Sequence, residues 1–145
     1  MMEDFTHIIV DGYNVINSWQ RLKRLRNKSL EFKRLSLIST LQNFSDYTGK
    51  EVSIVFDGNG VKELSKKDGS LSIIFSKKGE TADTVVERLV YRRKNKKKIL
   101  VATNDRIEQN MIFGMGATFI NSADFEIKIF SILQCLKDSY ERKNS

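Results

Sequence analysis

The sequence predicts an α/β protein built around a mostly parallel sheet. Short runs rich in β-branched residues alternate with longer segments of helical periodicity, which is the pattern of βαβ units. Proline is absent, so glycine and polar clusters separate the segments. The chain has 145 residues, of which 40% are hydrophobic, and this is enough apolar material for one packed core. We therefore expect a single domain over residues 1–145.

The first half of the chain is expected to hold two strands and one long helix. His7–Val10 is a short apolar run, typical of a strand that is covered on both faces. The basic segment 18–28 is expected to form a short helix or an ordered loop. Apolar residues then recur at helical spacing and predict an amphipathic helix over 29–47. Residues 51–56 are the second expected strand, and both strands are followed by Asp-Gly.

The alternation continues after residue 58. Residues 59–69 are expected to be a polar connection with room for one helical turn, and 70–75 the third strand. The apolar residues of 81–94 fall on one side of a helix. Residues 99–102 form a fourth apolar run and 117–120 a fifth.

Two more helices complete the predicted fold. Thr103-Asn104-Asp105 opens a helix that extends to about residue 113, and Ser122 is the expected N-cap of the last helix. The core stripe expected on that last helix is Phe125, Ile129, Ile132, Leu133, Leu136 and Tyr140.

The overall charge points to a polyanionic partner. Lys plus Arg is 25 and Asp plus Glu is 18, a surplus of +7, and the pI is near 9.5. Such a surplus favours nucleic acid first and an anionic membrane surface second. No apolar run approaches the roughly 20 residues of a membrane span, and the N-terminus does not resemble a signal peptide. One cysteine cannot form an internal disulfide, nor build the usual zinc site with a single histidine. We expect a cytoplasmic protein.

Acidic residues follow the ends of several predicted strands. Asp11 directly follows the first strand and Asp57 the second, while Asp105 lies three residues past the fourth. Glu80 and Asp83 open the helix after the third strand. Because the carboxyl ends of parallel strands lie along one edge of a sheet, we expect these carboxylates to share one rim.

Each of these acids also has an ordinary structural explanation. Asp-Gly pairs form turns, and acids in a first helical turn complement the helix dipole. However, a like-charge pair about 4 Å apart costs roughly 4 kcal/mol at an effective dielectric near 20. A helix N-terminus returns only about 0.3–1 kcal/mol per acid. Converging acids therefore need a cation.

The expected ligand atoms are all oxygens, which favours Mg²⁺ or Mn²⁺ over zinc. Such an ion polarises a phosphate ester and lowers the pKa of a bound water. Together with the basic composition, the acidic rim predicts metal-dependent phosphodiester hydrolysis.

Four short strings resemble those of a known family. They are Asp11-Gly-Tyr-Asn14, Val55-Phe-Asp57, Gly79-Glu-Thr-Ala-Asp83 and Ala102-Thr-Asn-Asp105. In this order, over residues 7–126, the chain resembles the YacP-like NYN-domain proteins of the PIN-like ribonuclease superfamily. The resemblance implies a three-layer α/β/α sandwich with strand order 3-2-1-4-5. It also implies a metal-dependent endoribonuclease that acts on single-stranded RNA, with ribosome-associated messenger RNA decay as the family's best-known setting.

The resemblance also assigns roles to the acids. Asp11, Asp83 and Asp105 match the family's acidic metal-binding positions and would be the catalytic residues. Glu80 and Asp57 match flanking acids that would assist in holding the metal.

Two polar residues match further family positions. Asn14 matches a polar residue of the first turn that orients a water or a phosphate. Asn104 stands where the family more often has serine, so the metal-binding acid Asp105 is kept but the hydroxyl contact of that serine is not expected here.

Basic residues near the same rim are the expected contacts for RNA phosphates. Tyr13 and Trp19 lie beside them and are placed to stack bases, with packing of the first helix on the sheet as an equal alternative. The basic run 92–98 is expected near the opposite edge, as a solvated surface or a contact with a large RNA. The expected substrate-binding residues are Tyr13, Asn14, Arg21, Lys23, Arg24, Lys77, Lys78 and Asn104.

Other functions remain open at this point. An RNA- or ribosome-binding module without catalysis would not need the acids. A small-molecule phosphohydrolase would share the acidic rim but would have no use for the surplus of positive charge. A nuclease acting on DNA and a growth-inhibiting toxin of the same superfamily are further alternatives. The sequence does not indicate the oligomeric state.

Overall fold

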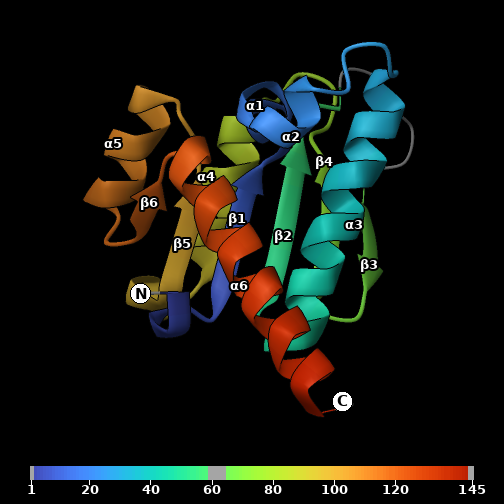
Figure 1. Ribbon diagram of the computed structural model, residues 1–145. Coiled ribbons are helices and arrows are strands. Elements are labelled where there is room, and N and C mark those ends of the chain that lie inside the picture. The colour runs from blue at the N-terminus through green and yellow to red at the C-terminus, as the bar shows by residue number, and fades with distance from the viewer. Residues whose placement is uncertain (1, 59–64, 144–145) are drawn as a thin grey trace.

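A computed structural model describes residues 2–58 and 65–143 and shows three layers, with helices on both faces of one sheet (Figure 1). The strands lie in the order β3-β4-β2-β1-β5-β6. All neighbouring strands are parallel except β3 and β4. The parallel part therefore has the expected order 3-2-1-4-5, and the predicted fold class is confirmed. The strands are β1 (His7–Asp11), β2 (Glu51–Phe56), β3 (Ser65–Asp68), β4 (Leu71–Phe75), β5 (Ile99–Ala102) and β6 (Thr118–Ile120).

The prediction of a polar connection over 59–69 was wrong for its second half, which contains β3. This strand pairs antiparallel with β4, with Ser65 opposite Ile74 and Asp68 opposite Leu71. Gly69 lies between the two strands at φ 60°, a conformation that glycine adopts without strain. An edge strand of polar residues has no apolar alternation to mark it in a sequence. The helical turn expected in 59–64 lies outside the described residues.

Among the described residues, four helices cover one face of the sheet, and the first of these was not predicted. Helix α1 begins directly after β1, whereas the sequence indicated structure only in the basic segment that follows. Fully buried side chains of α3 and α6, Leu37, Leu41, Phe44, Phe125 and Ile129, form the core on this face with Ile8 and Val10 of β1. The helices are α1 (Gly12–Ser18), α2 (Gln20–Lys23), α3 (Leu30–Thr48) and α6 (Ser122–Lys143).

Helix α6 departs from its prediction at both ends. Asn121, not Ser122, supplies the side-chain cap, because its Oδ1 accepts from the backbone N–H of Asp124 at 2.8 Å. Tyr140 was expected in the core stripe but is 69% exposed. The last turns of α6 run past the end of the sheet, where no layer is left to cover them (Figure 1).

The opposite face is covered by α4 (Ala82–Arg92) and α5 (Arg106–Gly114). Ile9 of β1 points to this side, where Val86 and Ile112 are fully buried, because successive strand residues face opposite ways. Both faces of β1 are thus buried, as its continuous apolar run indicated. Two short 3-10 helices, η1 (Met2–Asp4) and η2 (Lys96–Lys98), precede β1 and β5.

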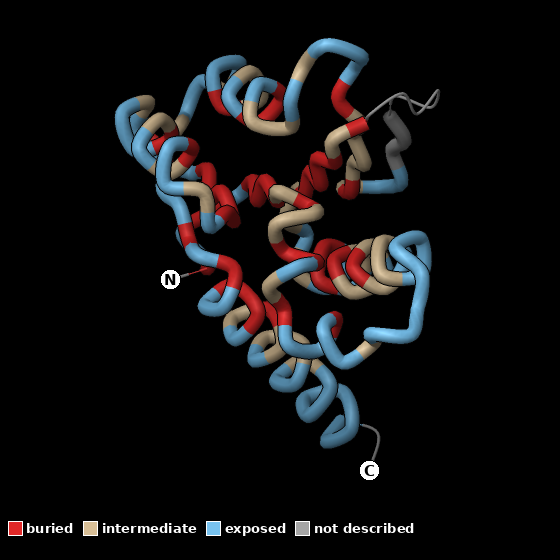
Figure 2. The backbone as a smooth tube through the Cα atoms, turned by 90° about the horizontal axis from the view of Figure 1, so that it is seen from above, coloured by how far each residue is buried: buried red, intermediate tan, exposed pale blue. Residues whose placement is uncertain are grey.

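Figure 2 shows the buried residues following the strands through the middle of the molecule, with exposed helix surfaces outside. Within the described ranges, no helix combines the length and the apolar character needed to cross a bilayer.

Candidate metal centre

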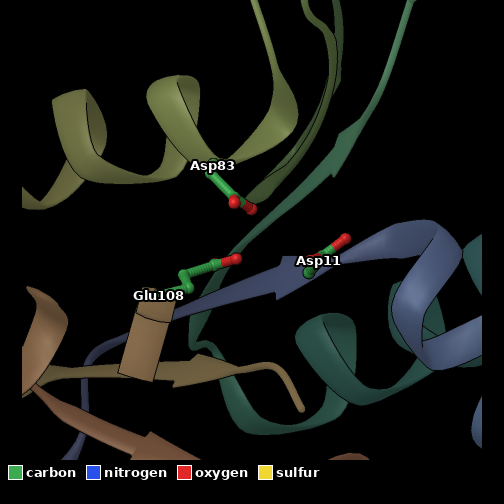
Figure 3. A group of neighbouring side chains, drawn as sticks. All are labelled: Asp11, Asp83 and Glu108. Atoms are coloured by element: carbon green, nitrogen blue, oxygen red, sulfur yellow. The ribbon is translucent and has the colours of Figure 1, made fainter. Parts of the chain in front are cut away.

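Three carboxylates from separate elements meet at the carboxyl edge of the sheet. Asp11 ends β1, Asp83 lies in the first turn of α4, and Glu108 lies in the first turn of α5. Each offers an oxygen, and these atoms all lie within 4.8 Å of one another. Figure 3 shows Asp83 and Glu108 pointing toward each other beside the strand that carries Asp11. We call Asp11, Asp83 and Glu108 the acidic trio.

A close contact between α1 and β2 holds Asp11 at this edge. Gly12 follows Asp11 and begins α1, and a Cβ at Gly12 would lie 2.3 Å from Cε1 of Phe56. Any side chain here would push α1 off the sheet. The glycine of this Asp-Gly pair thus serves close packing rather than a turn, and α1 can begin where β1 ends.

Side-chain caps place the two helices that carry Asp83 and Glu108. Thr81 caps α4 by accepting from the backbone N–H of Thr84 at 3.3 Å. Asp105 caps α5 through its Oδ1, which accepts from the N–H of Ile107 at 2.9 Å and of Glu108 at 3.3 Å. Both helices therefore start at the rim and direct an acid of their first turn inward.

Glu108 is the most deeply buried member of the trio. It is fully buried, and among the described residues its Oε1 has no hydrogen-bond partner. Its Oε2 accepts a long hydrogen bond from the hydroxyl of Thr103 at 3.4 Å. Burial, followed by the contact with Asp83 and the charge of Asp11, raises the pKa of Glu108 to about 10.

Asp11 is shifted in the same direction. Burial, and after it the charge of Asp83, raises the pKa of Asp11 to about 6. Without a cation, the trio therefore retains a proton at neutral pH. A cation would remove this preference for the protonated state.

The trio fits a hard divalent cation by distance and by chemistry. Two oxygens bound to one octahedral Mg²⁺ lie about 3.0 to 4.2 Å apart, since each bond is about 2.1 Å. The oxygens of the trio lie within 4.8 Å of one another, so modest side-chain movement would bring them to one ion, and all the ligand atoms are oxygens. The unpartnered Oε1 of Glu108 is a buried acceptor that such a cation would satisfy.

The structure brings only Asp11 and Asp83 of the predicted catalytic acids into the trio. Asp105 is outside the trio but close to it, since its charge contributes to the raised pKa of both Asp11 and Glu108. Its carboxylate serves as the N-cap of α5.

The two flanking acids lie outside the trio. Glu80 accepts from Arg88 at 3.1 Å and from the N–H of Lys77 at 2.8 Å, and these contacts lower its pKa. Asp57 lies two residues beyond Val55, which pairs with Asp11, and its Oδ1 is 3.4 Å from the Ser76 hydroxyl.

Sequence reasoning did not identify Glu108. The available signal was its spacing, three residues after Asp105, but Asp-x-x-Glu at a helix start normally predicts a capping box. In such a box the glutamate would turn back to the N-cap backbone. Here Thr103 donates to Glu108 and accepts from the N–H of Asp105. The side chain is thereby directed to the rim, and only the tertiary structure shows this.

The two predicted asparagine contacts hold loops together. Oδ1 of Asn14 accepts from the N–H of Asn104 and from the hydroxyl of Ser122, both at 2.9 Å. Oδ1 of Asn104 accepts from the N–H of Ser122 at 2.8 Å, and its amide nitrogen donates to Ser18 at 2.9 Å. These bonds join α1, the β5–α5 loop and the start of α6 beside the trio.

The aromatic residues considered for base stacking are packed in the protein. Trp19 is 1% exposed, so the stacking prediction was wrong for it and the packing alternative holds. Its indole N–H donates to the carbonyl of Ser122 at 3.0 Å. Tyr13 lies against Phe56, with ring centroids 4.9 Å apart, and its hydroxyl accepts from Arg34 at 2.9 Å.

The basic residues predicted to contact RNA differ in whether another side chain of the protein already binds them. Arg21 forms an ion pair with Glu126 at 3.3 Å, and its guanidinium lies 3.7 Å from the ring centroid of Phe130. Lys23 and Arg24 are exposed and line a pocket beside α2. Lys77 and Lys78 are exposed just before α4.

Comparisons with known proteins agree with this architecture. The sequence profile of the YacP-like NYN domain matches residues 8–145. The protein YacP of Bacillus subtilis (strain 168), described as uncharacterized, is 43% identical over 113 residues. That alignment covers 76% of this chain and 66% of the relative, just under two thirds of its length.

Crystal structures of Rae1 (YacP) from Bacillus subtilis are similar. One matches with a TM-score of 0.78 at 35% identity, over 93% of this chain and 79% of the other. The W164L mutant matches with a TM-score of 0.80 at 32% identity, over 96% and 83%.

Proposed function

The chain belongs to the YacP-like NYN domain family, and from this premise we propose that it is a metal-dependent endoribonuclease that cleaves single-stranded RNA. The observation that carries the proposal is the acidic trio, in which three carboxylate oxygens lie within 4.8 Å of one another. A protein that only bound RNA would gain nothing from this arrangement, because buried like charges destabilise the fold.

We assign Mg²⁺ or Mn²⁺ to the trio as the cofactor, on the basis of its oxygen ligands. When bound, the ion supplies Lewis-acid stabilisation of the phosphate charge and activates water. Asp11, Asp83 and Glu108 would hold it, and Asp105 would add negative charge beside them. The caps at Thr81 and Asp105 keep these carboxylates in place, so little reorganisation is needed when substrate arrives.

RNA is favoured as the substrate by the charge of the chain. The surplus of +7 includes cations near the rim, of which Lys77 and Lys78 lie a few residues before the start of α4 at Ala82. These side chains would neutralise phosphates beside the scissile bond. Hydrolysis at phosphorus would leave a 5′-phosphate and a 3′-hydroxyl. Messenger RNA on the ribosome is the setting that the family suggests.

The test is cleavage of labelled single-stranded RNA in Mn²⁺ by the wild type and by Asp83→Asn. We expect the wild type to cut the RNA and the variant to lose on the order of 100-fold in rate, since it removes a charged oxygen ligand. The matched control is Asp124→Asn, which alters an exposed acid in the first turn of α6 instead.

Equal cutting by both proteins would overturn the catalytic assignment. RNA binding without any cutting, on free RNA and on ribosome-bound messenger RNA alike, would favour a non-catalytic RNA-binding module.

A further inference from the structure

A basic pocket lies on the other face of the sheet from α4 and α5. It is formed at α1, α2 and the start of α3 and has a volume of about 480 Å³. Its polar lining consists of Asn17, Gln20, Lys23, Arg24, Arg26 and Lys33. We call this the α2 pocket.

The four cations of the α2 pocket have no anionic partner in the described part of the chain. No described acid lines the pocket, and no described carboxylate pairs with Lys23, Arg24, Arg26 or Lys33. By contrast, the neighbouring Arg21 is paired with Glu126. Cations gathered around one concavity repel each other, and an anion in the pocket would relieve that repulsion. Phosphate is the anion best matched to mixed lysine and arginine donors.

The α2 pocket lies at the same edge of the sheet as the acidic trio. Ile16 also lines the pocket and comes five residues after Asp11, a rise of roughly 8 Å along α1. Figure 1 shows α1 and α2 at the end of the molecule to which the arrowheads of β1 and β2 point. A flexible polyanion could therefore contact both places at once.

The lining of the pocket favours recognition of the backbone over the bases. Among the described residues, no aromatic side chain lines it, so it lacks the platform on which single-stranded bases usually stack. Its lysines and arginines suit phosphate oxygens, and its two amides suit sugar hydroxyls.

We propose that the α2 pocket binds the phosphodiester backbone of single-stranded RNA next to the segment that is cut, and so sets which bond reaches the acidic trio. The identification of RNA as the ligand rests on the proposed function, whereas the pocket and its cations are observed independently of it.

The test is the affinity for a fluorescent single-stranded RNA, measured in chelator so that no cutting occurs. We expect Lys23→Gln/Lys33→Gln to bind about tenfold more weakly at moderate salt. We also expect the slope of log K against log salt to become shallower by about 1.4, since each phosphate contact to a single strand contributes roughly 0.7.

The matched control is Lys97→Gln/Lys98→Gln, which removes the same two charges from exposed lysines of η2, at the opposite edge of the sheet. This variant should stay within twofold of the wild type. Equal losses in the two double variants would show that only net charge matters and would overturn the pocket.

The oligonucleotide is tested with a 5′-hydroxyl and with a 5′-phosphate. The same loss for both RNAs supports a backbone contact, whereas a loss seen only with the 5′-phosphate would make the pocket an end-binding site and overturn the proposal.

The wild type is also tested for cutting in Mn²⁺. If the double variant binds RNA more weakly but the wild type does not cut, the proposed nuclease function is wrong and the α2 pocket remains an RNA-binding site. If the wild type cuts and Lys23→Gln/Lys33→Gln binds RNA as tightly as the wild type, the nuclease function stands and the proposed role of the pocket is wrong.

Discussion

Two buried glutamates at the same edge of the sheet have opposite surroundings. Glu126 of α6 accepts from the backbone N–H groups of Gln20 and Arg21, at 3.0 and 3.1 Å, and pairs with the Arg21 guanidinium. Glu108 of α5 faces the carboxylates of Asp11 and Asp83, and its Oε1 has no partner among the described residues.

The comparison shows that Glu126 stabilises the fold, whereas Glu108 is buried without a stabilising partner among the described residues. Glu126 satisfies donors at the start of α2 and fixes α2 against α6, so its charge is compensated within the protein. Glu108 has no cation beside it within the described residues, and its burial and the charges of Asp11 and Asp83 hold it protonated at neutral pH. Because a glutamate of the unfolded chain is ionised at that pH, holding it protonated costs stability. Such a cost is expected where the missing partner is a ligand, and this supports the proposed metal site.

The largest expected difference between the two glutamates is in activity. Glu108→Gln should lower RNA cleavage in Mn²⁺ on the order of 100-fold, because it removes a metal ligand without changing the shape of the side chain. Glu126→Gln should retain activity within a few-fold per folded molecule. Single-turnover cleavage of labelled RNA measures both, and comparable losses in the two variants would remove Glu108 from the proposed site.

The second expected difference is in the pH dependence of stability. Because the pKa of Glu108 is raised to about 10 in the folded state, the folded chain binds more protons than the unfolded chain above pH 4.5. In chelator, stability should therefore fall between pH 7 and 9, by at most about 1.4 kcal/mol per pH unit. Urea unfolding at several pH values measures this slope.

The window of pH 7 to 9 isolates Glu108 from two other shifted groups. Burial lowers the pKa of His7 to about 4, so above pH 7 this histidine is mostly neutral in both states. Asp11, at about 6, is largely ionised there in both states. Glu108→Gln should flatten the slope, Glu126→Gln should keep it, and saturating Mn²⁺ should raise stability most at pH 9.

The third expected difference is in stability at neutral pH. Glu126→Gln should destabilise the protein by about 1–3 kcal/mol, because it weakens charge-assisted hydrogen bonds to the start of α2. In chelator at pH 7, Glu108→Gln should be neutral or stabilising, because glutamine is uncharged in both states and avoids the cost of protonating a buried glutamate on folding. Urea midpoints compare the two. A larger loss for Glu108→Gln would mean that Glu108 is a structural acid.

The smallest expected effect concerns Asp105. Asp105→Asn preserves the cap of α5, because asparagine caps as well as aspartate, so stability should change by less than about 0.5 kcal/mol. It removes the charge beside the trio and should weaken Mn²⁺ binding roughly tenfold. Calorimetric titration measures this. Unchanged affinity would leave Asp105 with its structural role alone.

The fold could be predicted largely because buried parallel strands have a strong sequence signature. Residues 51–56 and 99–102 are strands with the predicted limits, and the core stripe of α6 is correct at Phe125 and Ile129. Elements that are short or lie at the edge of the sheet lack this sequence signature, because burial does not determine the order of their apolar and polar residues. Strand β3 is polar because it lies at an edge, and helix α1 is short and follows its strand with no intervening loop.

For the candidate site, the sequence predicted the edge of the sheet where the acids gather, but not which of those acids face one another. The position of Asp11 after a strand and of Asp83 at the start of a helix followed from topology, since strand ends share one edge. Whether an acid of a helical first turn caps its helix or faces the rim depends on side-chain rotamers and on neighbours such as Thr103. For this reason Asp105 was expected in the group that Glu108 occupies.

The order of apolar and polar residues alone determined the parallel sheet and the edge where its acids would gather, because hydrophobic periodicity and the direction of parallel strands leave little choice. Which carboxylates face one another was decided by the packing of α1 on Phe56 and by the contacts of Thr103 with Glu108 and Asp105. Which lysines and arginines lack a carboxylate partner depends on how α1, α2 and α3 come together around the α2 pocket. These are contacts between residues far apart in the chain or choices among rotamers of similar energy, and local sequence encodes neither.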